Sequence, residues 1–174
     1  LFFALLSLPH FVISQIKTSE TKIRINEVLA SNTWNSIDPD YSAFSDWVEL
    51  YNYGTDDVDL GNHYLSDNFK NLKKWKVPPN SIIKSNGFYL FWADGRNNAN
   101  HTNFKLNPKS ETLFLSLNGQ LLDSIKLNNV PTDISVGRNK NAALVYFIEP
   151  SPNRKNTGNF TFNTIRSDSI ICSK

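Results

Sequence analysis

The stretch DWVELYNYGTDDVDLGNHYLSDN, residues 46–68, decides how this chain is interpreted. It holds six carboxylates, one histidine and several aromatic residues. Its first eight residues alternate between the two faces of a β-strand. One face carries Val48, Leu50 and Asn52, and the other carries Trp47, Glu49 and Tyr51. The stretch is therefore either an acid–base or metal site or the polar side of a half-buried sheet.

Short apolar runs recur on both sides of this stretch, separated by Asn, Gly, Asp and Pro. They predict strands over 23–30, 46–53, 58–67, 74–78, 87–94, 111–117, 120–127, 134–138 and 143–149. The run GFYLFWAD at 87–94 is almost continuously apolar, which is typical of a strand buried on both faces. Asn118-Gly119 predicts a type I′ hairpin turn, because both residues tolerate a positive φ. No stretch has convincing helical periodicity, so we expect an all-β sandwich or barrel.

The composition places the chain among globular proteins. Its 174 residues suffice for one domain with a core, at 40% hydrophobic and 20% charged residues. A formal net charge of +2 is too small to indicate a nucleic-acid partner by itself. No internal apolar run is long enough to predict a membrane span in the mature chain.

The N-terminus, LFFALLSLPHFVIS at 1–14, resembles the apolar core and cleavage site of a secretory signal peptide. The alternative is a stray apolar segment or a strand. The prediction places the protein outside the cell, at the cell surface or in the periplasm. Residues 15–21 would form a polar spacer and 22–149 the sandwich. Met is absent throughout, so we expect a longer reading frame.

The C-terminal stretch 150–174 is rich in Pro, Asn, Ser and Thr. We expect a closing turn and a linker or tail outside the core. The single cysteine, Cys172, cannot form an internal disulfide and lacks metal-ligand spacing.

The carboxylates of residues 46–68 have two interpretations each. Glu49, in mid-strand, is either a general acid with a raised pKa or a buried structural Glu held by backbone N–H groups or an arginine such as Arg138. Asp57 and Asp59 form a fragment of a calcium loop without its closing Glu, and turn formation is the simpler interpretation. We predict no metal site.

The histidines offer no catalytic pattern. His63 and His101 stand far apart in sequence, no further ligands cluster near either, and each is interpreted as a satisfied structural residue. The chain has no G-x-S-x-G elbow, no P-loop and no G-x-G-x-x-G. We therefore predict no catalytic residues and no cofactor.

The segment KNLKKWK at 70–76 interleaves lysines with an aromatic residue. Lys73, Lys74, Trp75 and Lys76 are the candidates for a surface that binds nucleic acid or polysaccharide. Protection of an edge strand against aggregation is the simpler interpretation of the same lysines.

Ten motifs in order give the chain a family resemblance. They are INEVLASN (25–32), DWVELYN (46–52), DVDLGNHYLSDN (57–68), KWKVP (74–78), GFYLFWADG (87–95), HTNFKL (101–106), the strand 111–117, LLDSI (121–125), TDISVGR (132–138) and PSPNRKN (150–156). The series resembles the lamin-tail domain in its secreted bacterial version. One departure is Asn153, where the family usually has Gly; Asn also tolerates the left-handed conformation.

The resemblance implies an immunoglobulin-like β-sandwich of about seven to nine short, mostly antiparallel strands. It also implies a non-catalytic binding or structural module, whose partner is an unknown protein, cell-envelope component or polysaccharide. An alternative is an N-terminal accessory domain of a larger secreted enzyme, such as a CotH-type kinase, a nuclease or another hydrolase.

Overall fold

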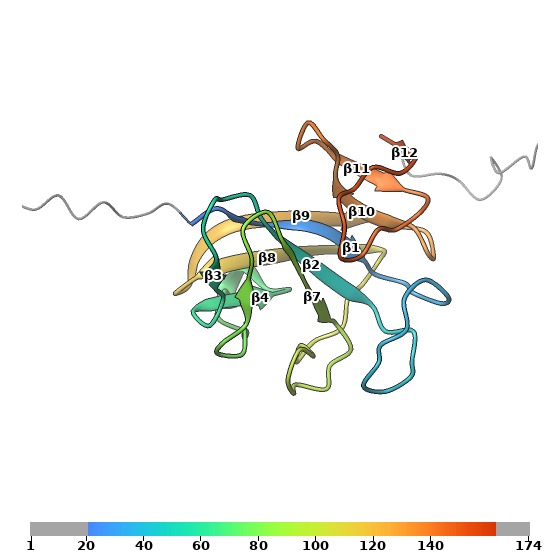
Figure 1. Ribbon diagram of the computed structural model, residues 1–174. Helices are drawn as coiled ribbons and strands as arrows, with labels where there is room; N and C mark the ends of the chain where they lie inside the picture. The colour runs from blue at the N-terminus through green and yellow to red at the C-terminus, as the bar shows by residue number, and fades with distance from the viewer. Residues whose placement is uncertain (1–20, 163–174) are drawn as a thin grey trace, which may run out of the picture.

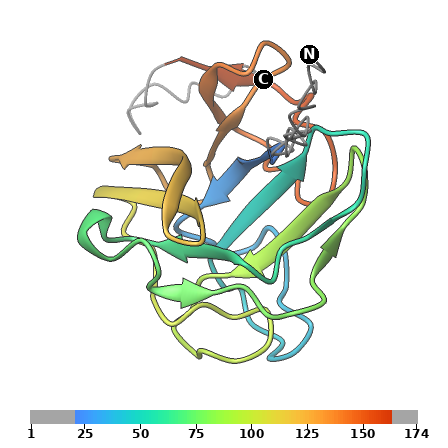
Figure 2. The ribbon, with the colours of Figure 1, turned by 90° about the vertical axis from the view of Figure 1, so that its left-hand side faces the viewer.

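Two antiparallel sheets face each other across one apolar core in the computed structural model, which describes residues 21–162 (Figures 1 and 2). The first sheet has the order β12 (Phe160–Thr161), β11 (Leu144–Phe147), β10 (Ser135–Arg138), β1 (Ile23–Leu29), β2 (Trp47–Asn52) and β7 (Phe88–Trp92). The second has the order β5 (Trp75–Lys76), β4 (His63–Ser66), β8 (Ser110–Leu117) and β9 (Gln120–Asn128). A short pair, β3 (Val58–Asp59) and β6 (Ile82–Ile83), completes the described strands.

The prediction of an all-β, immunoglobulin-like sandwich is confirmed. The described part contains twelve strands, more than the expected seven to nine, because several pairings are only two residues long. The predicted strand 58–67 is two strands, β3 and β4, separated by a turn in which Gly61 N donates to Asp59 Oδ1. The strands β6 and β12 were not predicted.

A bulge in β1 sets which residues face the core. Ile25 pairs with Leu50 and Glu27 pairs with Glu49, so Asn26 is the extra residue between them. Because of the bulge, Ile25 and Val28 both face inward, although three positions separate them. Glu27 faces outward beside Glu49.

The core lies between the two sheets and is built from both. The six-stranded sheet contributes Ile23, Ile25, Val28, Val48, Leu50, Phe91 and Val136, and the four-stranded sheet contributes Leu65, Trp75, Leu113, Leu115, Ile125 and Leu127. These strands therefore bury alternate residues against the opposite sheet, as in other sandwiches.

The prediction that strand 87–94 is buried on both faces is wrong. β7 is an edge strand, and Phe88, Tyr89 and Leu90 are only half-buried. The interior strands β1 and β2 have both faces covered, since residues 25–29 and 47–50 are all buried. On the outer face of β2, Trp47 packs with Leu29 and Trp92, and Glu49 is covered by residues 150–157.

The hairpin between β8 and β9 is confirmed. Asn118 has φ of 53° and Gly119 has φ of 90°, as a type I′ turn requires. In this turn a Cβ at Gly119 would lie 2.6 Å from Lys73 Cε.

Residues 150–157, here called the closing segment, lie within the fold, which corrects the expected boundary at 149. Pro150, Ser151 and Asn156 are buried, and β12 then pairs with β11. The polar composition of the segment reflects the buried carboxylates that it covers. The predicted signal peptide, residues 163–174 and Cys172 lie outside the described residues.

None of the helices described could cross a membrane. The described helix is the single-turn η1 (Phe69–Asn71), whose N-cap Asn68 accepts a hydrogen bond from Lys70 N.

Candidate functional site

Glu27 and Glu49 lie side by side on the outer face of the six-stranded sheet, and neither is exposed. Glu49 accepts hydrogen bonds from Asn26 Nδ2 at 2.7 Å and from the backbone N–H of Asn153. Glu27 accepts from the hydroxyl of Ser135 and from both the backbone N–H and the hydroxyl of Ser151. The closing segment therefore covers both carboxyl groups.

Burial raises the pKa of both carboxyl groups. The pKa of Glu49 rises to about 8 because desolvation outweighs the hydrogen bonds from Asn26 and Asn153, and the nearby charge of Glu27 adds to the effect. Desolvation also raises the pKa of Glu27, against the bonds from Ser135 and Ser151. A raised pKa is typical of a general acid, but here no substrate can reach the groups.

Glu49 is thus a buried structural residue, held in part by a backbone N–H as one interpretation predicted. The suggestion that Arg138 is the partner of Glu49 is wrong. Arg138 donates instead to Asp123 Oδ1 at 2.6 Å and to the carbonyl of Ile25 at 3.1 Å. Asn153 has φ of 62°, so the left-handed turn expected in place of the family glycine is present.

The turn carboxylate Asp57 forms an ion pair and accepts a backbone hydrogen bond. Asp57 Oδ2 pairs with Lys84 at 2.7 Å and Asp57 Oδ1 accepts from Ser85 N at 2.9 Å, and these bonds lower the pKa of Asp57. The structural interpretation of residues 46–68 therefore agrees with the contacts.

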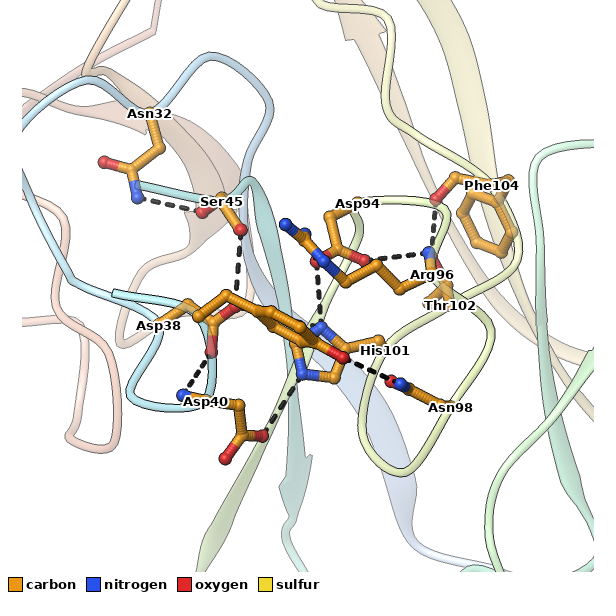
Figure 3. A network of polar contacts seen from close by, with 11 residues as sticks. Asn32, Asp38, Asp40, Ser45, Asp94, Arg96, Asn98, His101, Thr102 and Phe104 are labelled. Atoms are coloured by element: carbon orange, nitrogen blue, oxygen red, sulfur yellow. Dashed lines mark hydrogen bonds and ion pairs between the residues drawn. The ribbon is translucent and has the colours of Figure 1, made fainter. Parts of the chain in front are cut away.

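His101 is the centre of a polar network that sequence reasoning missed (Figure 3). Its buried ring has Nδ1 at 2.9 Å from Asp94 Oδ2 and Nε2 at 3.2 Å from Asp40 Oδ2. Asp38, which is fully buried, lies 3.9 Å from Nδ1. Burial opposes protonation of the ring, but the bonds to Asp94 and Asp40 and the charge of both Asp94 and Asp38 outweigh it and raise the pKa of His101.

The same residues could hold a divalent cation. One ligand atom each from Asp38, Asp94 and His101 lies within 4.8 Å of the others, although the sequence pattern had indicated no such cluster. Arg96 pairs with the same Asp94 oxygen, so a cation would compete with its guanidinium. The residues are remote in sequence, and Asp38-Pro39 and Asp94-Gly95 look like ordinary turns.

The network joins two loops, residues 30–46 and 93–104. The first, between β1 and β2, is also held by Asn32, whose Nδ2 donates to the carbonyls of Ser36 and Ser45. Asp38 N donates to Ala43 O at 2.8 Å across the same loop. The second loop is held to β7, where Thr102 N donates to Trp92 O. These contacts give an irregular loop a defined shape.

The β1–β2 loop nevertheless exposes large apolar side chains. They are Trp34 (64% exposed), Ile37 (58%), Phe44 (43%) and Tyr41 (42%). A depression lined by Ile37, Pro39, Leu90, Trp92 and Pro152 continues this surface onto β7 and the closing segment.

The four residues of the predicted surface-binding segment have different environments in the fold. Trp75 is only 4% exposed and packs edge-on against Phe91 in the core, so its ring cannot stack on a ligand. Lys74 pairs with Asp67 at 2.6 Å, while Lys73 packs near Gly119 and Tyr64. Lys73 and Lys76 are exposed, and Lys76 extends from the edge strand β5, which is the position expected for edge protection.

His63 is buried in β4, and neither ring nitrogen has a hydrogen-bond partner among the described residues. Burial lowers its pKa. His63 is two residues from the core residue Leu65 and so lies on the same face of β4, which is consistent with a structural role.

The family model described as Lamin Tail Domain matches residues 17–129. The chain belongs to the lamin tail domain family. Its match ends before β10, so the closing segment of this lamin tail domain lies beyond the matched residues. A comparison with curated proteins finds no significant match.

Proposed function

We propose that this lamin tail domain is a non-catalytic binding module of a secreted or surface-exposed protein, with the β1–β2 loop as its recognition surface. The observation that carries the proposal is the exposure of four large apolar side chains on a loop whose backbone is held by buried polar contacts. Rigid sheets commonly present recognition loops in this way. Ordering a loop before it binds also reduces the entropic cost of association.

The carboxylates support a binding role over catalysis. Glu27 and Glu49, whose raised pKa values would suit a general acid, are covered by the closing segment. A substrate would have to displace Ser151 and Asn153 to reach them.

The side chains of the loop favour a protein partner. Ile37 is aliphatic and lines a depression with the apolar residues Pro39, Leu90, Trp92 and Pro152, at whose rim Ser36 and Asn153 add polar groups. Five apolar residues with a few polar groups at the rim are typical of a pocket for an apolar side chain of a protein partner. The proposed partner is therefore a cell-envelope or extracellular protein with an exposed apolar residue.

The test compares binding of the labelled full chain, and of the variant Trp34→Ser with Ile37→Ser, to envelopes of the producing cells. A matched control is Leu121→Ser with Leu122→Ser, which removes two exposed apolar side chains from β9. We expect saturable binding that the loop variant reduces about tenfold or more, as for central interface residues, and that the control retains.

Treatment of the envelopes with a protease identifies the partner class. Loss of binding after proteolysis is the expected result. Binding that survives proteolysis would contradict a protein partner, and binding that is unchanged in the loop variant would contradict the proposed surface.

A further inference from the structure

A second cavity lies on the outer face of the six-stranded sheet, away from the β1–β2 loop surface. It encloses about 270 Å³ between β1, β2, β7, β10 and the closing segment. Its lining includes four cationic residues, Arg24, Arg138, Lys140 and Lys155, and no acidic residue. Positive charge is therefore concentrated in this cavity, although the net charge of the whole chain is only +2.

Three of the four cations are uncompensated in the described part of the chain. Arg138 is paired with Asp123 at 2.6 Å. Arg24, Lys140 and Lys155 form no ion pair with any described carboxylate. Glu49, a covered carboxyl group that bonds to the cavity residue Asn26, has a pKa of about 8, so it is mostly uncharged at neutral pH.

Arg24 is held in place but lacks a hydrogen-bond partner at one atom. Its guanidinium lies 5.4 Å from the ring centroids of both Tyr51 and Tyr53, and Tyr51 stacks on Phe88 at 4.8 Å. Arg24, Tyr51 and Phe88 are register neighbours across β1, β2 and β7, so the rings fix the position of the side chain. Its Nε is buried and has no acceptor among the described residues.

We propose that this cavity binds a tetrahedral oxyanion, a phosphate or sulfate group, with Arg24 as the fixed donor and Lys140 and Lys155 as mobile charges. The guanidinium of arginine presents several donors in one plane and bonds such oxyanions through two oxygens at once. Lysine supplies a flexible point charge, which suits the exposed positions of Lys140 and Lys155. The two Nη groups of Arg24, unlike the buried Nε, are not among the buried unpartnered atoms and would be the ones to bond the oxyanion.

The test is a titration of the isotopically labelled full chain with inorganic phosphate, at constant ionic strength against chloride, followed by amide chemical shifts. We expect saturable shifts confined to residues around the cavity, and similar shifts with sulfate. Acetate, which is planar, should bind more weakly. The absence of saturation with both phosphate and sulfate would overturn the proposal.

A charge-matched pair of variants separates the cavity from general electrostatics. Lys140→Gln with Lys155→Gln should weaken phosphate binding about tenfold, since charge-assisted bonds are lost. Lys109→Gln with Lys126→Gln removes the same charge from exposed sites elsewhere and should leave binding within about twofold. An equal loss in both pairs would overturn the proposal. Arg24→Lys keeps the charge but removes the planar donor set, and it should also weaken phosphate binding.

Methyl phosphate and a short single-stranded DNA distinguish the source of the oxyanion. Binding of methyl phosphate as tightly as phosphate indicates an ester-linked ligand, and binding of phosphate alone indicates a free ion; both outcomes support the site. Tight, steeply salt-dependent DNA binding without saturable phosphate binding would instead indicate an extended polyanion surface and overturn it.

Discussion

The closing segment covers Glu49, and this arrangement depends on the backbone conformation of Asn153. It has φ of 62°, and its backbone N–H donates to Glu49. Asn and Gly adopt this conformation readily, whereas a β-branched residue does not. A glycine at this position would therefore take the same backbone conformation as the asparagine of this chain.

Asn153→Val is expected to lower the free energy of unfolding by about 1–2 kcal/mol, because the branched side chain strains the left-handed backbone. Asn153→Gly should stay within about 0.5 kcal/mol of the parent chain, since glycine takes this φ freely. Denaturant unfolding followed by tryptophan fluorescence measures both. A valine variant as stable as the glycine variant would contradict the importance of the turn.

Glu49 predicts a pH dependence of stability whose sign follows from its raised pKa. The folded protein keeps the Glu49 proton up to about pH 8, whereas the unfolded chain loses it near 4.5. The stabilisation that protonated Glu49 contributes is complete below pH 4.5 and is lost as the pH rises through 8. The free energy of unfolding decreases by on the order of a few kcal/mol over this range.

Glu49→Gln removes the titrating group but keeps its shape. The variant should show a smaller decrease in stability between about pH 5 and pH 8 than the parent chain, and should be the more stable of the two at the upper end. Glu149→Gln, at an exposed site, is the control and should retain the parent slope. Identical slopes for the parent and Glu49→Gln would refute this account.

At the scale of elements, sequence patterns predicted the strands well and their surroundings poorly. Alternation identified β1 and β2, and Asn118-Gly119 identified the hairpin, because these signals depend on near neighbours. The burial of Trp75 and the partial exposure of Phe88 depend on the order of the strands and on the packing of the two sheets, which are long-range properties. The closing segment was misplaced because polar residues normally indicate a surface, but here they bond buried carboxyl groups.

The candidate sites depended even more on long-range contacts. His101 meets Asp38 and Asp40 across about 60 positions of sequence, and Arg24 shares a cavity with Lys155 from the opposite end of the domain. No local motif marks either group. The prediction that the chain has no catalytic residues used only local sequence patterns. The burial of Glu27 and Glu49 is a separate, structural reason to assign these two residues a structural role.

β10 and the closing segment approach closely at Gly137. A Cβ at this position would lie 2.8 Å from Asn156 Nδ2 and 2.9 Å from Asn26 O. Gly137→Ala should therefore separate the segment from the sheet and lower the free energy of unfolding by about 1–3 kcal/mol. Gly158→Ala is a matched control, because its Cβ would meet nothing nearer than 3.4 Å. Equal melting temperatures for the two variants would show that the close packing is unimportant.

At the scale of the whole molecule, His101 connects the two loops at one end of the sandwich. Its position between Asp94 and Asp40 raises its pKa, so its contribution to stability is complete below about pH 6.5 and is lost as pH rises through the folded value. Loss of the imidazole would leave the buried Asp38 without this cation, whereas Asp94 would keep Arg96, so the cost is at most about 3 kcal/mol.

His101→Ala should consequently loosen both loops while leaving the opposite end of the sandwich intact. Hydrogen exchange should become faster at Asp38 and Thr102, whose amides bond Ala43 O and Trp92 O, and remain slow in the β8–β9 hairpin. Asn98→Ala, which removes only the bond to Tyr41 Oη, is the control and should leave exchange at Asp38 and Thr102 unchanged. If the β1–β2 loop is the recognition surface, His101→Ala should also weaken envelope binding although Trp34 and Ile37 are unaltered. Faster exchange with undiminished binding would separate the shape of the loop from its function and contradict the view that the buried network prepares the loop for its partner.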